Sequence, residues 1–117
     1  MKETKLDFEG RAAPRLESEN LLAFRILDKD DKIIQEGMVK TLDISRTGIA
    51  IESKQPMEIG AKIILTIGMG DEIVRTTGTI QNQKKIADQI FHIGIAFDFL
   101  TDEDLNKIGM VYPSILK

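Results

Sequence analysis

Short segments in which apolar and polar residues alternate recur along residues 20–99, and turn-forming residues separate them. Alternation with a period of two is the pattern of a β-strand that has one face in a core and one face in water. The clearest example follows Gly48: Ile49 and Ile51 point to one side of the strand, and Ala50 and Glu52 point to the other. Several such strands joined by brief turns predict an antiparallel β-barrel or sandwich.

Six strands can be placed, with a seventh allowed by the spacing of the turns. The predicted strands are residues 20–28, 33–42, 49–53, 61–67, 72–83 and 89–99. Charged or glycine-rich segments at 28–32 and 68–71 are predicted hairpin turns, and 84–88 is a predicted connection. Glycine inside a strand favours a bulge or a bend, and we expect a bulge or a bend at Gly37 and a bend at Gly78.

The periodicity changes after residue 100. Thr101 is a residue type that caps helix N-termini, and acidic residues follow it in what would be the first turn. Leu105, Ile108 and Tyr112 share one face at helical spacing, bordered by Val111. Pro113 ends the helix, and 114–117 form a short tail. We expect this helix to close an open end of the barrel core.

Composition limits the classes of function. The chain has 117 residues and a net charge of −3, which disfavours duplex DNA as a partner. It contains no cysteine and one histidine, His92, so thiolate chemistry and a histidine metal cluster are not expected. No nucleophile–base pair is discernible, so we expect no catalytic residues, no metal site and no enzyme.

The remaining charged features have structural interpretations. The acidic turn with Asp28, Asp30 and Asp31 lacks the downstream glutamate of a calcium loop, so we interpret it as a solvated turn. His92 lies in a strand and is interpreted as a half-buried structural residue. Residues 1–19 are predicted to be a flexible arm, 20–100 the barrel, and 101–117 the helix and tail. The chain shows no signal peptide and no membrane-length apolar run, which predicts a cytoplasmic protein without membrane insertion.

Two polar clusters stand out from this background. Arg11 and Arg15 lie four residues apart on the arm, outside any strong apolar pattern. Asp43, Ser45 and Gly48 lie in a polar turn between two apolar strands. Aspartate and serine bond their own backbone in turns, and glycine accommodates positive φ, the role we expect for Gly48.

Arg-x-x-x-Arg followed about thirty residues later by Asp-x-Ser-x-x-Gly resembles the PilZ domain, the bacterial receptor module for cyclic di-GMP. The resemblance covers roughly residues 10–106 and includes the late strand 92–97. It implies a six- to seven-stranded antiparallel barrel with a short C-terminal helix. It also implies that Arg11 and Arg15 clasp bases and phosphates, that Asp43 and Ser45 contact guanine, and that Gly48 has a backbone role. Gly10, just before the first arginine, and Arg46, inside the turn, are possible additional contacts.

The residue chemistry agrees with this implication. An arginine fork matches the O6 and N7 acceptors of guanine, and ionised Asp43 accepts from the donors on the opposite edge. The first hypothesis is therefore a receptor in which cyclic di-GMP orders the arginine arm over the barrel and changes the interaction with an effector protein. The alternative is an interaction module with this fold and weak or no nucleotide binding. One or two ligand molecules, a monomer or a dimer, and a role in motility, attachment or exopolysaccharide control are all compatible with the sequence.

Overall fold

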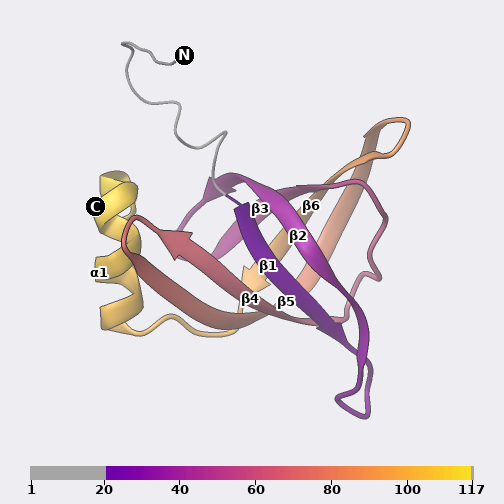
Figure 1. Cartoon of the computed structure of the whole chain (residues 1–117), viewed down its shortest axis with the longest axis horizontal. Coiled ribbons are helices and arrows are strands. Elements are labelled where there is room, and N and C mark those ends of the chain that lie inside the picture. The colour runs from indigo at the N-terminus through magenta and orange to yellow at the C-terminus, as the bar shows by residue number, and fades with distance from the viewer. Residues whose placement is uncertain (1–20, 117) are drawn as a thin grey trace.

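The computed structural model describes residues 21–116, and within them six antiparallel strands form a closed barrel (Figure 1). The strands are β1 (Leu21–Leu27), β2 (Ile33–Ile44), β3 (Gly48–Ser53), β4 (Lys62–Met69), β5 (Glu72–Ala87) and β6 (Ile90–Phe97). Their order around the barrel is β1-β2-β3-β6-β5-β4. The predicted fold class is confirmed, with six strands.

Alternating residues of every strand fill the barrel. Leu22, Phe24 and Ile26 of β1 face inward and are buried. The other strands contribute in the same way, so the core consists mainly of β-branched and leucine side chains. These are Ile44, Ile49, Ile51, Ile63, Leu65, Ile67, Val74, Ile80, Ile93 and Ile95. The period of two therefore predicted the buried face correctly, because neighbouring side chains of a strand must point to opposite sides.

The irregularities of the sheet differ from those predicted. Gly37 pairs in regular register with Phe24, and the β1–β2 ladder is instead interrupted near Ile34. Gly78 is also in register, opposite Phe97. The sheet therefore has no bulge at Gly37, where a bulge or a bend was predicted. At Gly78 an added Cβ would lie 2.5 Å from the carbonyl oxygen of Ala96, so close approach of two strands explains the glycine.

The hairpin formed by β5 and β6 is longer than predicted. Residues 84–87 continue β5 and pair with β6, so the predicted connection at 84–88 was wrong. The chain reverses only at Asp88 and Gln89, where Gln89 adopts a φ of 59°. In Figure 1 this hairpin projects from the barrel on the side away from α1.

The helix α1 (Asp102–Val111) begins where it was predicted to begin. Thr101 Oγ1 accepts from the backbone N–H of Asp104, and Asp104 Oδ2 accepts from the N–H of Thr101. Such a reciprocal capping box satisfies two N–H groups that lack a partner within the helix. Ile108 is fully buried beside the barrel, and Leu105 and Tyr112 are partly buried against the core.

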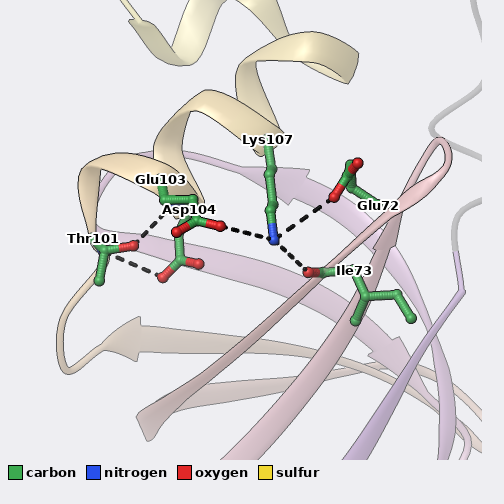
Figure 2. Close-up of polar contacts among 6 residues, drawn as sticks. All are labelled: Glu72, Ile73, Thr101, Glu103, Asp104 and Lys107. Atoms are coloured by element: carbon green, nitrogen blue, oxygen red, sulfur yellow. Dashed lines mark hydrogen bonds and ion pairs between the residues drawn. The ribbon is translucent and has the colours of Figure 1, made fainter.

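Two further contacts hold α1 on the barrel. Lys107 Nζ lies 3.7 Å from Glu72 and 3.5 Å from Glu103, and it donates to the carbonyl oxygen of Ile73 at 3.4 Å (Figure 2). After Pro113 the chain forms the short 3₁₀ helix η3 (Pro113–Leu116) where a simple tail was predicted, and Ile115 of η3 is buried.

Within residues 21–116, no helix has the length and apolar character needed to cross a membrane.

Replacing Thr101 by alanine should remove the cap and lower the free energy of unfolding by about 1 kcal/mol. Urea denaturation followed by circular dichroism measures this change. Thr101→Ser keeps an accepting hydroxyl and is the control, which should lose much less. Equal losses in both variants would show that the cap does not stabilise the helix.

Candidate functional site

The turn between β2 and β3 is organised by Ser45. Its Oγ accepts from the backbone N–H groups of Thr47 and Gly48, each at 3.3 Å, and it lies 3.2 Å from the hydroxyl of Thr47. The backbone N–H of Ser45 donates to the carbonyl oxygen of Gly48 at 2.8 Å. Serine is favoured at this position because its short side chain can accept hydrogen bonds from backbone N–H groups of the turn that would otherwise bond to water.

Asp43 lies at the end of β2, in the strand itself and not in the turn. The register between β2 and β3 shifts at Leu42, so that Thr41 opposes Ile51 and Asp43 opposes Ala50. A bulge of this kind re-aims the residues that follow it. Thr41 and Ile44 face the core, and Asp43 is exposed on the outer surface. Its carboxylate therefore faces solvent beside β3.

Gly48 has a different role from the one predicted. Its φ is not positive; the described glycines with positive φ are Gly60 and Gly70. Gly48 opposes Ala96 of β6, and an added Cβ would lie 2.4 Å from the carbonyl oxygen of Ile95. The glycine is required because two strand backbones approach each other more closely than any side chain allows.

Arg46 projects from the turn toward the C-terminal segment. Its Nε donates to the carbonyl oxygen of Ile115 at 2.7 Å, in a partly buried contact between residues 69 positions apart. The sequence offered two interpretations of Arg46, an additional ligand contact or a solvated side chain. The structure shows that its guanidinium is anchored on η3, so it is more than a solvated side chain.

The outer surface beside the turn carries four small residues. Gly48 and Ala50 of β3 are paired with Ala96 and Gly94 of β6, respectively. All four point outward and are only partly exposed, because their neighbours Ile49, Ile51, Ile93 and Ile95 fill the core. We call this two-by-two block of Gly48, Ala50, Gly94 and Ala96 the small-residue floor. None of the four carries more than a methyl group, so this part of the surface consists of backbone, two methyl groups and the amide of Asn82, which lies over Gly94.

Polar side chains border the small-residue floor on both sides. Asp43 stands next to Ala50 on the β2 side. On the β5 side, Asn82 is paired with Gly94 and Thr79 with Ala96. A charged row closes the end away from the turn: Glu52 lies 3.9 Å from Lys40 and 3.4 Å from His92, and Lys84 is paired with His92.

The structure brings together three of the predicted site residues, Asp43, Ser45 and Gly48, around the turn and the floor. Gly10, Arg11 and Arg15 lie outside the described residues. Sequence reasoning missed Ala50, Gly94, Ala96 and Asn82 as parts of the surface. The alternation of 48–52 and 92–97 marks the first three as outward-facing, but only the pairing of β3 with β6 places them side by side.

The other charged features are structural. Asp28 Oδ1 accepts from the backbone N–H groups of Asp30 and Lys32, which explains the acidic turn. His92 is partly exposed and contacts Glu52, as expected for a half-buried structural residue. Within residues 21–116, no group of three or more metal-ligating side chains converges.

The close approach at Gly48 gives a prediction that does not depend on ligand. Gly48→Ala should lower the free energy of unfolding by about 1–3 kcal/mol, because the added methyl group must displace backbone. Gly68→Ala is the matched control: Gly68 also lies in a strand, has no positive φ and has nothing within 4 Å of the position that an added methyl group would take. Urea denaturation of both variants measures the difference. A loss in Gly48→Ala no larger than in Gly68→Ala would contradict the close approach.

Comparisons with known proteins agree with this fold. Three solved structures of MrkH from K. pneumonia resemble the chain. One crystal form has a TM-score of 0.62 at 19% identity, the complex with c-di-GMP 0.60 at 19%, and the apo state 0.59 at 20%. Each covers 92% of this chain, and the chain spans about half of MrkH, 51–53%. No curated protein matches the chain significantly.

The family comparison covers most of the chain. The sequence profile of the PilZ domain matches residues 9–111, which include both arginines, the turn, the barrel and α1. This chain therefore belongs to the PilZ domain family.

Proposed function

We propose that this protein is a non-catalytic receptor for cyclic di-GMP, which binds on the small-residue floor between Asp43 and the arginines that precede β1. The observation that carries the proposal is the outward position of Asp43, an acceptor-only carboxylate beside the small-residue floor. Membership of the PilZ family supports the ligand class. One of the similar MrkH structures is a complex with c-di-GMP, which supports it further.

The start of β1 supports a contribution from Arg11 and Arg15. Leu21 is paired with Lys40, and Asp43 lies three residues farther along β2, roughly 10 Å away at ~3.3 Å per residue. Arg15 precedes Leu21 by six residues and Arg11 by ten, so the chain can span at most roughly 20 and 33 Å. Both arginines are therefore within covalent reach of Asp43 and of the floor.

The chemistry of guanine matches the two kinds of side chain. Asp43 can accept from the N–H donors on one edge of the base. An arginine can donate to O6 and N7 on the other edge, and a second arginine can pair with phosphate. The side chain of Asp43 makes no hydrogen bond or ion pair within residues 21–116, so its oxygens are available to such donors.

The expected affinity follows from a small number of bonds. Charge-assisted hydrogen bonds contribute roughly 1.5–3 kcal/mol each. Four or five of them, less the entropy lost when the arm is ordered, give about −8 kcal/mol, which is micromolar affinity. A ligand that bridges arm and barrel shifts the arm toward the bound arrangement by its differential affinity for that state.

We further propose that the output passes through an effector protein that recognises the ordered arm on the barrel. A PilZ domain is a receptor or adaptor module. MrkH is described as a transcription regulatory factor, but the net charge of −3 on this chain does not favour duplex DNA as its partner. Cytoplasmic localisation fits a receptor for a bacterial second messenger.

Isothermal titration with cyclic di-GMP tests the receptor function. The wild-type protein should bind with micromolar or lower Kd, and Arg15→Ala or Asp43→Ala should each weaken binding at least tenfold, because each removes a charge-assisted contact. Asp71→Ala removes an exposed carboxylate from the β4–β5 turn and is the control. Binding should also weaken as salt rises, since phosphate contacts are screened.

The same titration decides between the two hypotheses. No saturable binding by the wild-type protein would favour the interaction module. Saturable binding that Arg15→Ala and Asp43→Ala leave unchanged would place the ligand elsewhere on the molecule.

The floor itself can be tested by filling it. Ala50→Leu adds a side chain on the outer face beside Asp43, and we expect it to weaken cyclic di-GMP binding at least tenfold by occupying the space of the ligand. Ala23→Leu is the matched control, because Ala23 also faces outward but lies on β1, opposite Met38. Both variants should keep the wild-type melting profile. Equal Kd values for the two variants would show that the ligand does not lie on the floor.

A further inference from the structure

The proposed ligand has two guanines, and Asp43 can serve only one of them. Cyclic di-GMP is two-fold symmetric, so the second base presents the same donors and acceptors as the first. On the side of the small-residue floor away from Asp43, either another side chain forms hydrogen bonds with this second base or its polar atoms bond only to water. This inference rests on the proposed function and concerns the far border of the same surface.

The pairing of four strands places Asn82 directly opposite Asp43. One row runs across the outer surface from Asp43 of β2 through Ala50 of β3 and Gly94 of β6 to Asn82 of β5. Asn82 reaches this row because the β5–β6 register shifts at Gln81, after which the exposed side chain of Asn82 points outward. At ~4.8 Å between strands, Asp43 and Asn82 lie roughly 14 Å apart along the surface.

The carboxamide of Asn82 lies flat against the floor. A Cβ added to Gly94 would meet Asn82 Oδ1 at 2.6 Å and Nδ2 at 2.9 Å. The side chain therefore leans toward β6, and its amide lies over Gly94 and covers that corner of the floor. Gly94 permits this arrangement, because any larger residue would push the amide away.

Several other polar groups near this border already have partners. Thr77 and Thr79 donate to the two carboxylate oxygens of Asp98, at 2.8 and 3.4 Å. Gln83 Oε1 accepts from the backbone N–H of Met57 at 2.7 Å. His92 contacts Glu52 at 3.4 Å. The amide of Asn82 makes no hydrogen bond within residues 21–116, so it can bind a base without losing an existing contact.

We propose that Asn82 binds the second purine of the cyclic dinucleotide, as the counterpart of Asp43 across the floor. Its Oδ1 accepts from the N1–H of guanine and its Nδ2 donates to O6. The two borders differ in chemistry. Asp43 only accepts, and so requires a base with two adjacent donors. Asn82 both accepts and donates, and so can pair with guanine or, through N6 and N1, with adenine.

Isothermal titration with cyclic di-GMP and with the hybrid cyclic GMP–AMP tests this proposal. Asn82→Ala should raise the Kd for cyclic di-GMP roughly 5- to 30-fold, the loss expected for one or two neutral hydrogen bonds. Asn82→Asp makes the far border acceptor-only, so the ratio of the hybrid Kd to the cyclic di-GMP Kd should rise about tenfold above the wild-type ratio. Using a ratio cancels the repulsion between the new carboxylate and the phosphates, which both ligands share.

Asn106→Ala is the matched control, because Asn106 is an exposed asparagine on α1. It should leave both Kd values unchanged. If the wild-type protein binds cyclic di-GMP and Asn82→Ala binds as well as Asn106→Ala, the role of Asn82 is refuted while the receptor function stands. An unchanged ratio in Asn82→Asp would equally refute it. If the wild-type protein does not bind, the receptor function itself fails, and the role of Asn82 fails with it.

Discussion

The close approach of β3 and β6 is the constraint on which the candidate site depends. A Cβ added to Gly48 would lie 2.4 Å from the carbonyl oxygen of Ile95. On the other side of β6, a Cβ added to Gly78 of β5 would lie 2.5 Å from the carbonyl oxygen of Ala96. A strand held this tightly between two neighbours has no room for side chains at the contact points. Gly78 faces the core, whereas Gly48 lies on the outer wall beside the turn, where Ala50, Gly94 and Ala96 add no more than methyl groups and polar residues stand at the borders. The same packing that closes the barrel thus keeps large side chains off this part of its outer surface.

The sequence predicted local features well, because local features depend on neighbouring residues. Alternation separated Ile49 and Ile51, which are buried, from Ala50 and Glu52, and Thr101 was identified as the helix cap from residue type and position alone. Prediction from the sequence failed where a local feature depends on residues far away in the chain. The end of β5 was misplaced because residues 84–87, which begin with two lysines, are held in the strand by pairing with β6, and the sequence around them does not show that pairing. Gly48 was assigned positive φ because a turn glycine and a close-approach glycine look identical in sequence, and only the position of Ile95, 47 residues later, distinguishes them.

The Asp-x-Ser-x-x-Gly motif combines two kinds of requirement. Ser45 holds the turn through bonds to the N–H groups of Thr47 and Gly48, and Gly48 allows β3 to approach β6. A protein that used this barrel only as a scaffold would need both residues. Asp43 is different, because it is exposed and its side chain bonds to nothing within residues 21–116. The turn therefore does not need a carboxylate at that position. For this reason Asp43 favours the receptor hypothesis over the interaction module more strongly than the motif as a whole does.

The turn also connects the floor to the C-terminal end of the chain. Arg46 lies between Ser45 and Thr47, and its Nε donates to the carbonyl oxygen of Ile115 in η3, the segment that follows α1. Ile115 and Ile108 are both buried, so η3 and α1 belong to the core and are held at one point by the turn. A contact made by the C-terminal segment with Arg46 therefore acts on a turn that begins two residues after Asp43, beside the proposed site. Coupling between two binding events is reciprocal. If the proposed ligand favours one arrangement of the turn, a partner that binds the C-terminal segment and stabilises the same arrangement tightens ligand binding by the same free energy.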